Sequence, residues 1–194
     1  MTRGGRCTIA LLIVLGCVTS ACRLRRPDVM PARMIEPLLA EPKAAGDPPV
    51  APLPVRLLDT QSRAHIGRRL LHQQAGGELV EDPVWRWSSS PARYLDSALR
   101  LAATSAGVQL VDIANAPTIA VTLIAWNLES TQNTHLVGAV ELTVTSLDRA
   151  VTTEVIRNSE PLSSELPGDL AAAAGRLMAA LATESLTRAS RGLK

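Results

Sequence analysis

Aromatic residues and cysteines are scarce in this 194-residue chain, and both are unevenly distributed. There is no phenylalanine and one tyrosine, and two of the three tryptophans, Trp85 and Trp87, lie almost side by side. All three cysteines lie within the first 22 residues, at Cys7, Cys17 and Cys22. The remaining residues can therefore form no disulfide framework and no cysteine-based metal site.

The sequence also lacks a strong charge of either sign. The whole chain carries 20 basic and 18 acidic residues. The first 22 residues include Arg3 and Arg6 but no acidic residue, so the rest of the chain is balanced at 18 of each sign. Domains that bind nucleic acid usually carry a clear basic excess, so this composition gives no argument for nucleic acid as a partner.

Catalytic and cofactor motifs are missing as well. No Gly-rich phosphate loop ends in Lys-Ser or Lys-Thr, so the chain is not expected to be an ATPase itself. Neither HExxH nor GxSxG occurs, and the acidic residues form no evident pair for hydrolysis. The histidines, His65, His72 and His135, show no metal-binding spacing. We therefore expect no enzyme activity, no cofactor and no metal site.

The first 22 residues have the pattern of a secretory leader. Two arginines precede a short apolar run at residues 9–15, and small residues follow it as far as Cys22. The apolar run is too short to remain in a bilayer as a transmembrane helix. The pattern predicts a lipoprotein signal peptide over residues 1–22, cleaved before a cysteine that carries acyl chains such as palmitate.

Two cysteines are candidates for this lipid anchor. Cys17 directly follows the apolar run, whereas Cys22 follows the small residues Thr19-Ser20-Ala21. We favour Cys22, because the polar stretch that begins at Arg23 is a plausible mature start; an ordinary cleaved signal with incidental cysteines is the alternative. Aspartate after the lipidated cysteine often retains a bacterial lipoprotein at the inner membrane. Because arginine stands there, we expect the periplasmic face of the outer membrane.

Residues 23–54 are expected to form a Pro-rich, disordered tether. Eight of the thirteen prolines lie between Pro27 and Pro54, a density that disfavours both helix and sheet. Fully extended, the Pro-rich stretch 27–54 would reach roughly 80 Å at ~3.1 Å per residue. A short helix at residues 34–39 is an alternative for one part of it. The folded domain is then expected over residues 55–194.

Alternation of apolar and polar residues predicts the strands of this domain. Strands are expected at residues 55–58, 64–73 and 78–85, the last two forming a hairpin around Ala75-Gly76-Gly77. Further strands are expected at 108–113, 118–128, 135–147 and 151–157, with a meander at the end. In the strand 118–128, one face is expected to carry Ile119, Val121 and Leu123, and the other Thr122, Ile124 and Trp126. In the next strand, Leu136, Val140, Leu142 and Val144 share one face, and the opposite face is expected to meet water.

Two helices complete the predicted domain. Ser90 suits the N-cap of the first helix and Pro91 its first position, and Gly107 is a natural stop. Leu95 and Leu99 fall on its apolar face. A second, Ala-rich helix is expected at residues 169–190, with an apolar stripe made of Leu170, Ala174, Leu177, Leu181 and Ser185. This order predicts an α+β fold, a mainly antiparallel sheet with two helices packed on it.

Trp85 and Trp87 stand where the strand 78–85 leads into the first helix. With so few aromatics available, we expect them to anchor that helix onto the sheet. A ligand-binding or partner-binding surface is the alternative interpretation.

These segments, taken in order, resemble the ABC-type transport auxiliary lipoprotein family, which includes the paraquat-inducible lipoprotein C. The resemblance covers about residues 55–190. Its most specific elements are Trp85-Arg86-Trp87 and the following helix with Leu95 and Leu99. It implies a non-enzymatic, periplasm-facing lipoprotein that works with an MCE-domain protein, a membrane permease and an ATPase. Such a system moves lipids or other hydrophobic molecules between the two membranes; the cargo, the direction and homo-oligomerisation stay open.

A second class of function also fits a small lipoprotein without catalytic groups. It is a structural lipoprotein that assists assembly of an outer-membrane machine, of the lipopolysaccharide-assembly or pilotin type. An MCE-domain gene and a permease gene beside this one would favour transport. A secretin or large β-barrel gene would favour assembly.

Overall fold

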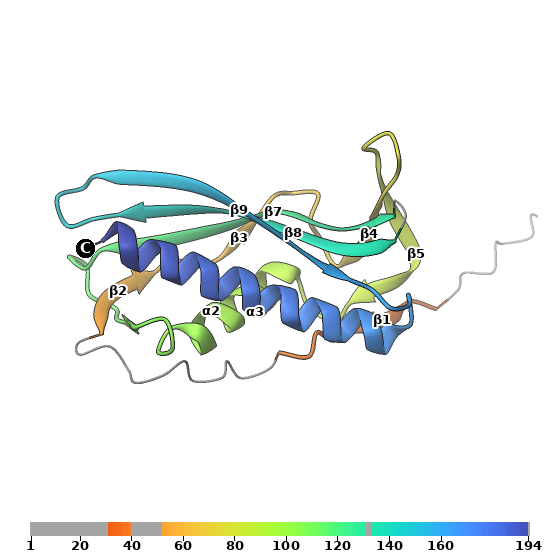
Figure 1. The fold of residues 1–194 in the computed structure, drawn as a ribbon, viewed down its shortest axis with the longest axis horizontal. Helices are drawn as coiled ribbons and strands as arrows, with labels where there is room; N and C mark the ends of the chain where they lie inside the picture. Colours follow the sequence, from red (N-terminus) through yellow and green to blue (C-terminus); the bar gives the residue numbers. More distant parts are fainter. Residues whose placement is uncertain (1–30, 40–51, 131–132, 194) are drawn as a thin grey trace, which may run out of the picture. The chain divides into compact units, whose positions relative to one another are not determined.

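Strand β7 (Thr118–Ser130) is the centre of the sheet, because it has partners along both edges. The computed structural model describes residues 31–39, 52–130 and 133–193 (Figure 1). Cys17, Cys22 and most of the expected tether lie outside these residues. Antiparallel β8 (Thr134–Thr145) occupies one edge of β7 over its whole length, and β9 (Val151–Pro161) pairs antiparallel with β8. The predicted meander is therefore confirmed.

The other edge of β7 is shared by three short strands that all run parallel to it. They are β2 (Leu53–Leu57), β3 (Gln61–Ser62) and β4 (Arg69–Gln73). β2 also pairs with β6 (Val108–Leu110), and β4 forms the predicted hairpin with β5 (Leu79–Trp87). The expected continuous strand at 64–73 is wrong in its first half. Residues 64–68 turn instead, because the Ile66 amide donates to the Arg63 carbonyl at 2.9 Å and the Ile66 side chain enters the core.

Strand β5 bends sharply in its middle. Leu71 of β4 is opposite Glu81, but Arg69, only two residues away, is opposite Arg86. The extra residues of β5 are held by Asp82, whose Oδ1 accepts hydrogen bonds from the Val84 amide at 2.8 Å and the Trp85 amide at 2.7 Å. A proline at position 83 suits this bend, since it has no N–H to leave unpaired.

Residues 33–35 form a short strand, β1 (Arg33–Ile35), that pairs parallel with the end of β5. This corrects the expectation of a helix at 34–39, and it puts these residues in the fold rather than in a tether. The segment is fixed by buried Ile35 and by the Leu38 amide, which donates to the Ala171 carbonyl at 3.1 Å. The open edge of β5 supplies partners that this Pro-flanked segment could not find alone.

Helices α2 (Pro91–Ala102) and α3 (Pro167–Gly192) lie on the same face of the sheet (Figure 1). The predicted α+β class, a mainly antiparallel sheet with two helices, is confirmed. Ser90 is the N-cap of α2 and Pro91 its first residue, although the Ser90 side chain makes no capping hydrogen bond. The helix ends before Gly107, which has a φ of 72° at the end of the following turn. The predicted apolar stripe of α3 is buried.

Trp126 is on the opposite face from the one that alternation predicts. A bulge in β7 between Leu123 and Ala125 adds one residue to the strand and exchanges the two faces beyond it. Trp126 therefore joins Leu123 in the core, where its ring centroid is 5.7 Å from that of Trp87. Gly138 on β8 leaves room for this ring, because a Cβ there would lie 3.1 Å from Trp126 Cζ3.

Candidate functional site

The residues that carry the family resemblance are mainly core residues. Trp87, Leu95 and Leu99 are each 0% exposed and belong to one cluster that joins β5, α2 and β7. Trp85 is half-buried, with the Arg33 guanidinium 5.6 Å from its ring centroid. Arg86 lies between the two tryptophans in β5 and lines a pocket together with Arg68 and Arg69. The core interpretation of Trp87 is therefore confirmed.

An open groove of 1090 Å³ lies beside the C-terminal half of α3. Apolar side chains from the sheet, Leu142 and Val144, and from the helix, Ala179 and Ala180, form part of its lining. The rest is mostly polar and comes from β9, from α3 and from the turn that follows α2: Ser105, Thr152, Glu154, Thr183, Glu184, Thr187, Arg188, Arg191 and Gly192. Apolar walls with a few polar groups are typical of binding sites.

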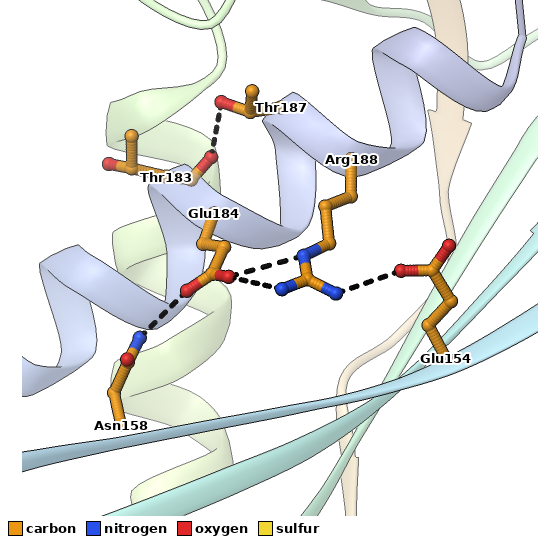
Figure 2. Close-up of polar contacts among 6 residues, drawn as sticks. All are labelled: Glu154, Asn158, Thr183, Glu184, Thr187 and Arg188. Atoms are coloured by element: carbon orange, nitrogen blue, oxygen red, sulfur yellow. Dashed lines mark hydrogen bonds and ion pairs between the residues drawn. The ribbon is translucent and has the colours of Figure 1, made fainter.

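A chain of hydrogen bonds and ion pairs joins α3 to β9 at this groove (Figure 2). Arg188 stands at its centre, with Nη1 donating to Glu154 at 3.0 Å and Nη2 donating to Glu184 at 2.6 Å. The other oxygen of Glu184 accepts from Asn158 Nδ2 at 3.0 Å. These contacts fix the spacing of helix and strand, and therefore the width of the groove.

Hydrogen bonds hold Glu184 and Arg188 in their ionised states. Hydrogen bonds from Asn158 and Arg188 lower the pKa of Glu184, despite partial burial. Hydrogen bonds to Glu154 and Glu184 raise the pKa of Arg188. A carboxylate with a lowered pKa is a poor proton donor or acceptor near neutral pH, so these groups suit positioning and recognition better than acid–base chemistry.

Strand β9 forms one wall of the groove, and its outer edge has no partner strand among the described residues. Proteins usually protect such an edge with charged side chains. In β9 the charged side chains are engaged within the molecule: Glu154 with Arg188, Arg157 with Glu129, and Glu160 with Arg176. Val151 and Val155 remain exposed on the face opposite the helices. The edge is therefore accessible to an added strand.

Among residues 31–39, 52–130 and 133–193, no three His, Cys, Asp or Glu side chains gather closely enough to hold a metal ion. His72 is in contact with Asp82, with 3.0 Å between Nε2 and Oδ2, while His65 lies in a turn and not on a strand as expected. None of the helices described has the length and apolar character needed to cross a membrane.

This groove was not predicted from the sequence. Its one readable sign was the spacing of Glu184 and Arg188, which at i and i+4 predicts an ion pair along a helix. The partners from β9, Glu154 and Asn158, could not be assigned, because which helix face meets β9 depends on the tertiary fold.

Comparison with solved structures shows the fold. Protein XCC0632 from Xanthomonas campestris, of family DUF330, superposes with a TM-score of 0.67 at 18% identity, over 81% of this chain and 94% of that one. An uncharacterized protein superposes with a TM-score of 0.59 at 12% identity, over 83% of this chain and 98% of that one. A minor lipoprotein from Acinetobacter baumannii superposes with a TM-score of only 0.42 at 13% identity, over 72% of this chain and 93% of that one. No family model and no curated protein matches the chain.

Proposed function

We propose that this protein is a lipid-anchored, non-catalytic subunit of an MCE-type ABC transport system in the bacterial cell envelope. It would be held at the periplasmic face of the outer membrane through Cys22, or otherwise Cys17. There it would work with an MCE-domain protein, a permease and an ATPase that move lipids or other hydrophobic molecules. The leader pattern and the resemblance around Trp85-Arg86-Trp87 support this proposal, and the fold is compatible with it.

The observation that carries the proposal is the open edge of β9 beside the α3 groove. An extended segment of a partner protein can add to such an edge through main-chain hydrogen bonds, and side chains at alternate positions then enter neighbouring pockets. Apolar side chains of that segment would enter the groove and contact its apolar lining residues: Leu142, Val144, Ala179 and Ala180. The occupant that we propose is therefore an extended, partly apolar segment of the MCE-domain protein.

The position of β1 supports a membrane-proximal role. Arg33, where the folded part begins, is eleven residues after Cys22. Eleven residues span at most about 40 Å when fully extended. The domain would therefore stay near the membrane surface that holds the lipid, at about one third of the distance that a tether through residue 54 would allow.

A pull-down from solubilised envelopes tests this docking surface. We would place lysine on the β9 edge with Val155→Lys, because an edge lysine opposes strand addition. Ile113→Lys is the matched control, since Ile113 is 57% exposed, Val155 is 59% exposed, and position 113 is outside the groove lining. The tagged wild-type protein and the control are expected to recover an MCE-domain protein, and Val155→Lys to recover at least tenfold less.

Two results would count against the proposal. Equal recovery with Val155→Lys would exclude the β9 edge as the docking surface. Repeated recovery of only a secretin or a β-barrel assembly protein would favour the assembly class. Replacing both Cys17 and Cys22 tests the anchor separately, and it should reproduce much of the envelope defect of a deletion even when the domain is still secreted.

A further inference from the structure

A second pocket, of 490 Å³, lies on the sheet face opposite the helices. It is formed by the β4–β5 hairpin and the turn that precedes β4. Three arginines line it, Arg68, Arg69 and Arg86, together with His65. The other lining residues are Ala64, Gly67, Leu71, Leu79 and Glu81. Glu81 is the one acidic residue in this lining, so the pocket carries a positive excess.

The three arginines differ in how their charges are balanced. Arg69 forms an ion pair with Glu81. Arg68 is held in place, since its Nε donates to the Trp87 carbonyl at 3.2 Å, but no carboxylate among the described residues pairs with it. Arg86 has neither kind of partner there: its Nε is buried and without a hydrogen bond within the described structure. The positive excess therefore centres on Arg68 and Arg86.

The backbone places the charge of Arg86 opposite another arginine. Arg69 and Arg86 are directly opposite each other across β4 and β5. Like charges at opposite positions of neighbouring strands repel, and a buried guanidinium nitrogen without a partner adds a desolvation cost. A bound anion would relieve both costs, because it would supply acceptors to Arg86 and a charge opposite to that of the cluster.

The geometry points to a phosphate-binding site in this pocket, recognising the phosphate group of a phospholipid head group or of a free phosphate. Guanidinium groups bind phosphate oxygens in pairs, and two arginines that line one pocket, such as Arg68 and Arg86, suit a tetrahedral anion. The pocket volume lies within the range of roughly 300–1,000 Å³ that small-molecule sites occupy. This inference concerns the face opposite the α3 groove and does not depend on the proposed transport role.

Thermal unfolding of the full mature lipoprotein, purified in a non-ionic detergent, tests the site. One titration uses sodium phosphate against sodium chloride at equal ionic strength. Another uses monomeric dihexanoyl-phosphatidylglycerol against dihexanoyl-phosphatidylcholine. A ligand that binds only the folded state raises the unfolding temperature in a saturable way. We expect such a rise with phosphate or with the phosphatidylglycerol, and the ligand with the lower half-saturating concentration identifies the source.

The decisive variant is Arg86→Gln, with Arg93→Gln as the matched control. Arg93 is exposed on α2 and outside the pocket lining, so its replacement removes the same charge from another surface. Arg86→Gln should raise the half-saturating ligand concentration at least tenfold. Arg93→Gln should leave this concentration within twofold of the wild-type value. Without anion, Arg86→Gln should unfold at or above the wild-type temperature, because it removes a repulsion.

A second variant keeps the test independent of any folding defect at Arg86. Arg68→Gln removes the other unbalanced arginine and should also weaken binding at least tenfold. The inference is overturned if neither ligand raises the unfolding temperature beyond its control titration. It is equally overturned if both Arg86→Gln and Arg68→Gln respond as the wild type does.

Discussion

The two edges of β7 are built in different ways. On one edge, β8 pairs with β7 from Thr118 to Ser130, with a single bulge. On the other edge, β2, β3 and β4 each contribute only two register positions, one after another along the strand. The first edge, the regular edge, is stabilised by a continuous ladder of main-chain hydrogen bonds. The second edge, the short-strand edge, is stabilised by the side chains that its short strands bury. Loss of one buried side chain should therefore be felt most on the second edge.

The largest expected effect is at Trp87, which links the short-strand edge to β7 through Trp126. Trp87→Ala should lower the free energy of unfolding by about 3–5 kcal/mol, as truncation of a large buried aromatic does. Chemical denaturation followed by far-UV circular dichroism measures this loss. Trp85→Ala is the control, and its cost should be clearly smaller because Trp85 is only half-buried. Equal costs would mean that the Trp87–Trp126 contact does not carry the stability of this edge.

An intermediate effect is expected at Gly138, on the regular edge. A methyl group there would lie 2.8 Å from Leu181 Cδ1 and 3.1 Å from the Trp126 ring. The leucine end can move, but the buried ring has little room, so Gly138→Ala should cost about 1–3 kcal/mol by overpacking. Gly76→Ala, where no atom lies within 4 Å of the added Cβ, is the control. An unchanged denaturation midpoint for Gly138→Ala would contradict this packing.

The smallest effect is expected at Asp82, which holds the bend of β5. Burial raises the pKa of Asp82, but hydrogen bonds from the Trp85 and Val84 amides and from His72 lower the pKa by more than burial raises it. The pKa of Asp82 is therefore below the usual 3.8. Because the folded-state pKa is lower than the unfolded one, this stabilisation is present above about pH 3.8 and is lost as the pH falls through the folded value.

Asp82→Asn should therefore cost about 1 kcal/mol at pH 7 and converge with the wild type in acid. Urea titrations at several pH values between 7 and 3 provide the measurement. Exposed Asp112→Asn is the control and should show no such convergence. A parallel pH dependence for Asp82→Asn and the wild type would show that the carboxylate does not stabilise the bend.

The regular edge was largely predictable from the sequence, and the short-strand edge was not. Alternation in β8 identified Leu136, Val140, Leu142 and Val144 as core residues, and all are buried. The error at Trp126 has one cause, since a single inserted residue exchanges faces and leaves no mark in the alternation. On the opposite face of β8, which was expected to meet water, Val137 is only 2% exposed. The Arg157–Glu129 ion pair crosses β8 on that face.

Two of the short strands, β1 and β3, escaped prediction because their partners are remote in sequence. β1 and β3 contain three and two residues, too few to show any period. β1 also lies between prolines, which favoured the expectation of a tether. The candidate site shares this limit: the groove at Arg188 and the pocket at Arg86 are each assembled from strands and loops that only the fold brings together.

The pairing of β1 with β5 also has a mechanical consequence. If Cys22 carries the lipid, any pull between the membrane and the domain reaches the fold first at Arg33, through a ladder of only three register positions. Under tension this strand would detach before the longer β7–β8 ladder. The leash would then run from Cys22 to Leu53 and could extend to about 110 Å instead of about 40 Å. With a lipid on Cys22, β1 would act as a latch that sets two working lengths for the anchor.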